Sequence, residues 1–327
     1  MKRLAAIVGV IVAVMVIAFL LARTPDTDPA EMREKYGAAP SQFVTLPDGR
    51  TVHLRDEGPR GAPAIVLLHG SNADLHTWQA WVDGLKSEYR VIRLDQRGHG
   101  LTGPAPDGDY RTEAFATDID AVADALGLQG FVLAGNSMGG AIAARYAMDR
   151  PERLTGLVLI DAGGAPVQRD GGGNLAFTLA RIPVVNQLAF AIMPRSIIEK
   201  SLKQSVARKD IVTPAMADRY WELARYPGNR TATLDRFSLG WQTFTQQQVS
   251  AISVPTLVMW GEEDSLIPFA AANWYMERLP SATLVSYPGI GHLPMEEAPQ
   301  HSLRDLRAWL SGLSPAARSP GAGRDPV

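Results

Sequence analysis

The sequence lacks cysteine altogether in its 327 residues. This absence excludes disulfide bonds, thiolate metal ligands and a cysteine nucleophile, although it does not identify the compartment. An excess of charge of one sign is lacking too, because 32 basic and 34 acidic side chains leave a formal net charge of −2. Nucleic-acid-binding proteins normally carry a basic excess, so we expect no nucleic-acid partner.

Motifs for cofactors and metals are also missing. The chain has no P-loop and no HExxH zinc motif. Gly98, Gly100 and Gly103 formally match the dinucleotide fingerprint, but Pro104 and Pro106 follow where that fingerprint requires a helix. We therefore expect no nucleotide, no other cofactor and no metal.

Only one hydrophobic run is long enough to suggest a membrane span. Two basic residues precede 19 uncharged residues, Leu4 to Ala22. At about 1.5 Å per residue, this run nearly matches the ~30 Å hydrocarbon core. It is longer than the ~7–15 residues of a signal-peptide core and lacks a small-x-small cleavage site. We predict an uncleaved signal anchor, residues 1–23, in preference to a cleaved signal peptide or a buried helix.

The charges that flank this run predict its orientation. Positive charge precedes the run and an acidic stretch follows it, which places the N-terminus in the cytoplasm. The protein would then be a single-pass protein of the inner membrane with its remaining residues in a bacterial periplasm. If the segment were cleaved, the protein would be periplasmic or secreted. Residues 24–40 read as a polar tether with a possible short helix, and residues 314–327 as a disordered tail.

Short apolar runs alternate with amphipathic stretches along most of the chain. Residues 43–54 alternate in polarity around Asp48-Gly49, which predicts a β-hairpin. Later runs are rich in Val, Ile and Leu and barely alternate, as is typical of strands buried on both faces. These runs cover residues 64–70, 89–95, 131–135, 154–161, 255–261 and 283–289. Helical stretches between them predict an α/β fold, a mostly parallel sheet with helices on both faces.

One long interval, residues 163–252, contains no convincing strand. Residues 213–228 predict a helix that Thr213 caps and Pro227-Gly228 ends, and residues 175–182 also have a helical apolar period. We therefore predict that this interval is a helical insertion. The sheet-bearing core would consist of residues 41–162 and 253–313.

A serine lies among glycines in LAGNSMGGAIAA, residues 133–144. A predicted strand ends and a predicted helix begins here, so the chain must turn sharply at Ser137. Such a turn needs an unfavourable backbone angle at its apex and small neighbours, which Gly135 and Gly139 supply. The pattern is the G-x-S-x-G nucleophile elbow. It also occurs in turns whose serine only caps a helix. Whether Ser137 is a nucleophile therefore depends on whether the chain supplies a base and an acid as its partners.

Candidate partners follow other predicted strands. A serine nucleophile needs a base and an acid that orients the base. His292 follows the last predicted strand, the acidic run 262–264 follows the preceding one, and Asp161 ends another. Because ligands of open parallel sheets bind beyond the carboxyl ends of the strands, these side chains could meet Ser137. The residues alone leave the identity of the acid open.

The order of these motifs resembles the α/β-hydrolase superfamily, in particular serine esterases and lipases with a helical lid. The resemblance extends over residues 42–312. It implies that Ser137 is the nucleophile, that His292 is the base, and that Asp264, the last residue of strand-G-x-x-D, is the acid. It also implies that the helical insertion is a lid over an acyl pocket.

The stretch LLHGS, residues 67–71, resembles the oxyanion loop of that superfamily. The resemblance implies that the backbone amides of Ser71 and Met138 form the oxyanion hole, and that His69 supports the loop. Residues 95–103, DQRGHGLTG, resemble a loop that is structural in the family. Five side chains are candidates for an apolar pocket, of which Trp78 and Trp241 are predicted to bind substrate: Trp78, Trp81, Met138, Trp221 and Trp241.

Together these features predict a carboxylesterase-like serine hydrolase that acts on an ester of a small apolar molecule. Haloalkane dehalogenases and epoxide hydrolases carry aspartate where this chain has Ser137, so they are excluded. Carbon–carbon bond hydrolases share the G-N-S-[MF]-G-G elbow and remain an alternative, although HGSN in this chain departs from their glycine-rich oxyanion loop. A cofactor-free perhydrolase is a weaker alternative than either of these hydrolases. A non-catalytic ligand-binding protein is the alternative from another class. The sequence makes no prediction of the oligomeric state.

Overall fold

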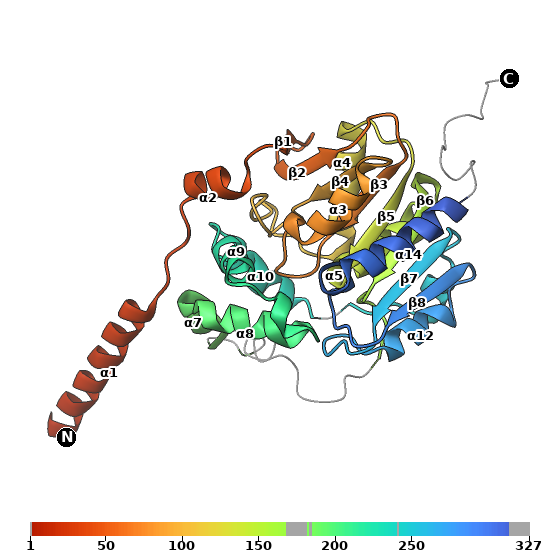
Figure 1. Cartoon of the computed structure of the whole chain (residues 1–327). Coiled ribbons are helices and arrows are strands. Elements are labelled where there is room, and N and C mark those ends of the chain that lie inside the picture. Colours follow the sequence, from red (N-terminus) through yellow and green to blue (C-terminus); the bar gives the residue numbers. More distant parts are fainter. Residues whose placement is uncertain (1, 168–181, 183–184, 241, 314–327) are drawn as a thin grey trace.

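An eight-stranded sheet forms the centre of the computed structural model, which describes residues 2–167, 182, 185–240 and 242–313 (Figure 1). Its order is β1-β2-β4-β3-β5-β6-β7-β8. The pairs β1–β2 and β2–β4 are antiparallel, and the other neighbours are parallel. The strands are β1 (Ser41–Thr45), β2 (Thr51–Glu57), β3 (Ala64–Leu68), β4 (Arg90–Leu94), β5 (Phe131–Asn136), β6 (Leu154–Ile160), β7 (Thr256–Gly261) and β8 (Ala282–Tyr287). The predicted hairpin and the mostly parallel sheet are confirmed.

Burial on both faces explains why the strand sequences barely alternate. Every residue of β3 to β7 is buried, whereas the edge strands β1 and β8 are partly exposed. Even β4 is fully buried, although it carries two arginines. Arg90 pairs with Asp56 and Arg93 with Glu57, each at 2.8 Å, on the neighbouring strand β2. Buried charge is tolerated here because each guanidinium has a carboxylate partner.

Helices cover both faces of the sheet, as predicted, and each face has its own cluster of buried side chains. One face carries α4 (Thr112–Ala125), α5 (Met138–Asp149), α11 (Gln246–Ser250) and α12 (Ala270–Met276). The other carries the 3₁₀ helix η1 (Leu75–Trp78), α3 (Gln79–Leu85), α13 (Pro294–Glu297) and α14 (Pro299–Gly312). A short 3₁₀ helix, η2 (Pro151–Arg153), leads into β6.

The described part of residues 163–252 contains helices and no strand. Before α11 come α7 (Val185–Ile192), α8 (Arg195–Ser205), the 3₁₀ helix η3 (Lys209–Ile211), α9 (Pro214–Ala224) and α10 (Asn229–Ser238), and Figure 1 shows α7 to α10 grouped beside the sheet. The predicted helix at 213–228 corresponds to α9, and the Thr213 hydroxyl accepts from the amide of Met216 at 3.1 Å. The helix predicted at 175–182 lies, except for Ile182, outside the described residues.

At the N-terminus, helix α1 (Lys2–Ala22) projects away from the remainder of the chain (Figure 1). Among the described residues, we find no helix whose length and apolar character are sufficient to cross a membrane. The predicted transmembrane helix is therefore not confirmed.

The segment between α1 and the sheet packs against the helical insertion. It includes the short helix α2 (Pro29–Tyr36), and Met32 on this helix is buried. The side chains of Lys35 and Tyr36 both donate to the Glu222 carboxylate on α9, each at 2.6 Å. The chain that leads out of α1 is therefore attached directly to the insertion.

Candidate active site

The turn between β5 and α5 has the backbone geometry that the sequence predicts. Ser137 has φ 56° and ψ −116°, in a region that residues other than glycine rarely occupy. A Cβ at Gly135 would lie 2.1 Å from the carbonyl oxygen of Gly139, and one at Gly139 would lie 2.3 Å from that of Leu68. No larger residue fits either position. Ser137 directly precedes the N-terminus of α5, where the helix dipole favours negative charge.

The predicted base and one of the predicted acids lie together. His292 follows β8 and Asp264 follows β7, and both are buried. His292 Nδ1 lies 2.7 Å from Asp264 Oδ2. The other carboxylate oxygen accepts from the amides of Leu266 at 2.7 Å and Ile267 at 3.0 Å. The carboxylate is thus fixed from three sides, and the hydrogen bond at Nδ1 leaves His292 Nε2 for another partner.

A pocket at the carboxyl ends of the strands brings Ser137 and His292 together. Its volume is about 160 Å³, similar to that of a cavity of about 150 Å³ that accommodates benzene. The helical insertion supplies much of its apolar lining, including Ala189, Phe190, Met193, Ile197, Ile198 and Leu202. The pocket therefore suits an apolar group of the size of a single ring or a short chain.

Asp161, the alternative acid, lies beside the same pair. It follows β6, is fully buried, and accepts from the Gly261 amide at 3.0 Å. Ligand atoms of Asp161, Asp264 and His292 all lie within 4.8 Å of one another. Burial, followed by the charge of Asp264, raises the pKa of Asp161 well above its usual range. A neutral carboxyl cannot stabilise an imidazolium by charge, which favours Asp264 as the acid.

The spacing of these three side chains would also suit a metal ion. However, the 2.7 Å hydrogen bond between His292 and Asp264 already uses a ring nitrogen and a carboxylate oxygen that such an ion would need. The raised pKa of Asp161 further reduces its value as an anionic ligand. The cluster is better suited to holding protons than to holding a metal.

The loop that carries His292 is held by a residue that the sequence analysis missed. Glu297 is fully buried, and its carboxylate accepts from the amides of Gly291 at 3.0 Å and Ala207 at 2.8 Å. The Asn136 amide group donates to the carbonyl oxygen of His292 at 3.0 Å. Since Ala207 belongs to the helical insertion, Glu297 joins the insertion to the His292 loop. Its neighbour Glu296 is also a glutamate, and nothing in that local pattern marks Glu297 as a buried residue.

The candidate oxyanion loop lies directly against the serine. A Cβ at Gly70 would lie 3.2 Å from Ser137 Cβ. Met138 is the first residue of α5, so its amide has no carbonyl partner within the helix. The Ser71 amide donates to no backbone oxygen in the part of the chain that the structure describes. The predicted roles of Ser71 and Met138 remain predictions that this placement permits.

His69 supports this loop, as predicted. Its ring is fully buried. The Gln96 amide donates to His69 Nε2 at 3.1 Å, and the Gln96 side chain donates to the His69 carbonyl at 2.7 Å. Burial lowers the pKa of His69, which keeps the ring neutral and able to accept that hydrogen bond.

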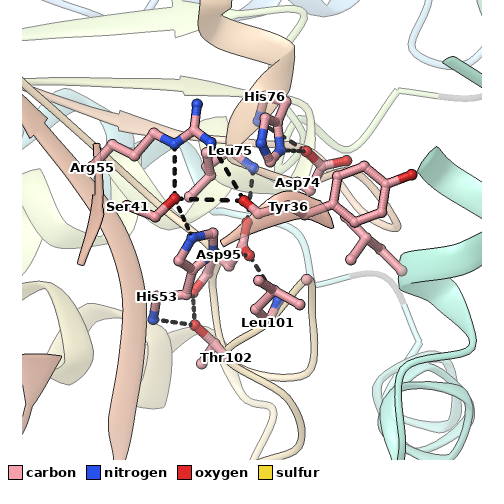
Figure 2. Close-up of polar contacts among 12 residues, drawn as sticks. Tyr36, Ser41, His53, Arg55, Asp74, Leu75, His76, Asp95, Leu101 and Thr102 are labelled. Atoms are coloured by element: carbon pink, nitrogen blue, oxygen red, sulfur yellow. Dashed lines mark hydrogen bonds and ion pairs between the residues drawn. The ribbon is translucent and has the colours of Figure 1, made fainter. Parts of the chain in front are cut away.

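The loop at residues 95–103 also has the structural role that was predicted, and Figure 2 shows its central contacts. Asp95 accepts from the amides of Leu75 and Leu101, each at 2.8 Å, and its Oδ2 lies 2.7 Å from His53 Nδ1. Because Leu75 begins η1, this network fixes the chain that leaves the candidate oxyanion loop.

The prediction that Trp78 binds substrate is wrong. Trp78 is fully buried, packs against Trp81 at a ring-centroid distance of 5.2 Å, and belongs to the cluster between the sheet and α14. Trp78 on η1 faces the sheet because burial of its apolar ring there removes that surface from water. Trp241 lies outside the described residues. The pocket is lined instead by Tyr220 and Phe237, among others.

The chain is similar to known proteins over most of its length. The family model of the alpha/beta hydrolase fold matches residues 63–299. Lipase 3 of Moraxella sp. (strain TA144) is 26% identical over an alignment of 280 residues, with 83% of this chain and 84% of that lipase covered. The 2-hydroxy-6-oxononadienedioate/2-hydroxy-6-oxononatrienedioate hydrolase of Comamonas testosteroni is 26% identical over 278 residues, with 80% and 93% covered. The crystal structure of a membrane phospholipase A, a bacterial virulence factor, is similar in fold, with a TM-score of 0.74, 24% identity and 96% and 99% coverage.

Proposed function

This chain belongs to the alpha/beta hydrolase fold family, and from that membership we propose that it is a serine hydrolase that cleaves carboxylic esters of small apolar molecules. One observation carries the proposal. Ser137 occupies a strained turn at the pocket that His292 also lines, and His292 is hydrogen-bonded to a buried carboxylate, that of Asp264. These are the parts that acyl transfer to water requires.

In the proposed mechanism, Ser137 Oγ forms a bond to the ester carbonyl carbon while His292 Nε2 takes the hydroxyl proton. Asp264 holds the imidazole through Nδ1 and stabilises its positive charge. The carbonyl electron pair moves onto oxygen, and the amides of Ser71 and Met138 stabilise this anion, each by about 3 kcal/mol. His292 then gives its proton to the leaving alcohol, and water hydrolyses the acyl-enzyme in the same way.

The lining of the pocket supports an uncharged, apolar substrate. Among the described residues that line it, none is Asp, Glu, Lys or Arg. Its polar groups, such as Asn72, Tyr220 and Thr233, are neutral. A charged substrate would lose its hydration here without gaining an ionic partner.

Hydrolysis of a carbon–carbon bond is the second candidate, because hydrolases of that kind share the G-N-S-M-G-G elbow. The Comamonas relative is, by its name, a hydrolase of a dioate. A dioate carries two carboxylates, and the described lining offers no cation to pair with them. An ester is therefore the better substrate for this pocket. Binding of a ligand without turnover is the outcome that remains if neither bond is cleaved.

The test uses the full chain in mild detergent with p-nitrophenyl esters from acetate to palmitate. We expect wild-type protein to release nitrophenol, most rapidly with a short acyl chain, and Ser137→Ala to release none. Turnover of a 2-hydroxy-6-oxodienoate without ester hydrolysis would assign the protein to carbon–carbon cleavage. If neither substrate is cleaved, binding of a ligand without turnover remains as the function.

We also propose that α1 attaches the protein to the inner membrane, with the catalytic part in the periplasm. Apolar side chains along this helix, such as Leu4, Ile11 and Leu20, are more than half exposed, at 68%, 51% and 59%. Apolar surface in water costs about 25 cal/mol per Å², which an apolar phase would remove. Full-length protein should remain with membranes after a carbonate wash, whereas protein lacking residues 1–23 should be soluble. Release of the full-length protein by carbonate would contradict this attachment.

A further inference from the structure

Arg236 on α10 is buried, and the described part of the chain offers it no carboxylate partner. It is 8% exposed, and no Asp or Glu among the described residues forms an ion pair with it. The buried arginines of the core differ in this respect: Arg90, Arg93 and Arg97 each pair with a carboxylate, at 2.8, 2.8 and 2.6 Å. An unpaired buried charge is costly, so its position calls for an explanation.

The hydrogen bonds of Arg236 are directed to the candidate oxyanion loop. Its Nη2 donates to Asn72 Oδ1 at 2.9 Å, to Ser71 Oγ at 3.1 Å and to Thr233 Oγ1 at 3.4 Å. The Thr233 hydroxyl, one helical turn earlier, donates to the same Asn72 oxygen at 3.2 Å. Two side chains of α10 thus hold two consecutive residues of the loop.

The loop needs such support because its backbone is strained. Asn72 has φ 60°, the left-handed region that favours glycine. Gly70, which precedes Ser71, lies against Ser137. A small shift of Ser71 would therefore move the Ser71 amide relative to the reacting carbonyl. On the other side, α10 is fixed to the core by the Asn229 side chain, which donates to the carbonyl of Gly100 at 3.0 Å.

The guanidinium remains charged in this position. Burial lowers the pKa of Arg236 to about 10, which still leaves it protonated at neutral pH. Its Nε and Nη1 are buried and have no hydrogen-bond partner among the residues that the structure describes. The charge is consequently not neutralised by any nearby carboxylate among the described residues.

We propose that Arg236 is a positioning residue for the oxyanion hole. From α10 it fixes Ser71 and Asn72 so that the Ser71 amide faces the developing oxyanion. The unneutralised positive charge of Arg236 further stabilises that oxyanion. This inference rests on the proposed serine-hydrolase function. It also makes the insertion part of the machinery, since α10 must be in place for the loop to be set.

The test compares Arg236→Met with Arg225→Met as a matched control. Arg225 is a buried arginine of the same insertion that donates to the carbonyls of Trp221 and Pro25, and it does not line the pocket. On a p-nitrophenyl ester, Arg236→Met should lower kcat about 100-fold, the effect of losing about one oxyanion donor. Its KM should change by less than about threefold, because ground-state binding is not affected. Arg225→Met should leave both constants within about threefold of wild type.

Further variants separate charge from geometry. Arg236→Lys keeps the charge but loses the planar guanidinium group, so its kcat should be about tenfold higher than that of Arg236→Met. Millimolar guanidinium should restore part of the kcat of Arg236→Ala and have no effect on Arg225→Ala. An unchanged kcat in Arg236→Met, or an equal loss in Arg225→Met, would overturn the positioning role.

Amide hydrogen exchange tests the loop contact independently of turnover. In Arg236→Met, exchange at residues 70–73 should accelerate at least about tenfold, and in Arg225→Met it should not. If wild-type protein cleaves no ester but this exchange pattern is found, the proposed function fails while the contact stands. Unchanged exchange at residues 70–73 in Arg236→Met would overturn the inference in either case.

Discussion

Two clusters of serine, histidine and aspartate lie in the described part of this protein. In both, a histidine Nδ1 lies 2.7 Å from an aspartate Oδ2: His292 with Asp264, and His53 with Asp95. In the second cluster, His53 Nε2 also lies 2.9 Å from Ser41 Oγ (Figure 2). By hydrogen-bond distances alone, the second cluster is the more complete triad.

The surroundings of the two serines differ. Ser41 lies in β1, its hydroxyl oxygen also accepts from Arg55 Nε at 2.9 Å, and it does not line the pocket. Ser137 lies at the pocket, on a turn with φ 56° at the N-terminus of a helix. A histidine–aspartate pair is thus a common structural device. Reactivity additionally requires a serine with an open approach and amides that can receive the developing negative charge.

The largest expected effect comes from exchanging the two serines for alanine. Ser137→Ala should lower kcat by about 10⁶-fold, since removal of a serine nucleophile has that effect in subtilisin. Ser41→Ala should leave kcat within about twofold and lower the free energy of unfolding by about 1 kcal/mol, the worth of a typical hydrogen bond. Steady-state hydrolysis and urea unfolding measure the two quantities. Full activity in Ser137→Ala would break the comparison.

The next largest effect distinguishes the two acids near His292. Asp264→Asn should lower kcat about 10⁴-fold, because an amide favours the wrong imidazole tautomer. Asp161→Asn should lower it less than about tenfold, because an asparagine resembles the neutral carboxyl that burial maintains at Asp161. The opposite order of the two variants would transfer the role of the acid to Asp161.

The second cluster should control stability instead. Asp95→Asn removes the charge from a fully enclosed pair, and breaking a buried pair costs about 3–5 kcal/mol. Although burial opposes it, the electrostatic interaction and the hydrogen bond with His53 hold the pKa of Asp95 below its usual range. We expect a lower urea midpoint, with the kcat of the folded fraction within a few-fold of wild type. A loss of kcat as large as that of Asp264→Asn would remove the distinction between the clusters.

The smallest expected effect is a dependence of stability on pH that originates at Asp161. Its pKa is raised in the folded state, so above the unfolded pKa of about 3.9 the folded protein binds one proton more than the unfolded chain. The wild type therefore loses stability, by up to about 1.4 kcal/mol per pH unit, as the pH rises from about 4 towards the folded pKa. Asp161→Asn should not show this loss. The melting temperature of the variant relative to that of the wild type should rise as the pH increases above about 4, and a difference that does not depend on pH would contradict the raised pKa of Asp161.

The strands and the elbow could be predicted because their causes are local in sequence. Apolar runs without alternation marked the buried strands, and the glycines around Ser137 marked a turn with a left-handed apex. Thr213 and Pro214 likewise marked the start of α9. The structure places His292 and Asp264 together, as strand order in a parallel sheet leads one to expect.

Contacts between the insertion and the core could not be predicted in this way. Glu297, Arg236 and Lys35 find partners that are 90, 165 and 187 residues away in sequence. Nothing in their local pattern distinguishes them from exposed charges. Trp78 was assigned wrongly for the same reason, because an aromatic side chain near the active-site loop can face either the pocket or the core.

The most direct test of the central claim is the site at which a serine-directed fluorophosphonate modifies the full chain, located by mass spectrometry of its peptides. The phosphonyl group imitates the tetrahedral centre of acyl transfer and reacts only with an activated serine. We predict one adduct, on Ser137, that forms at a wild-type rate in Ser41→Ala and is absent in His292→Ala. An adduct on Ser41, or no adduct on Ser137 in the wild type, would contradict the assignment of the active serine.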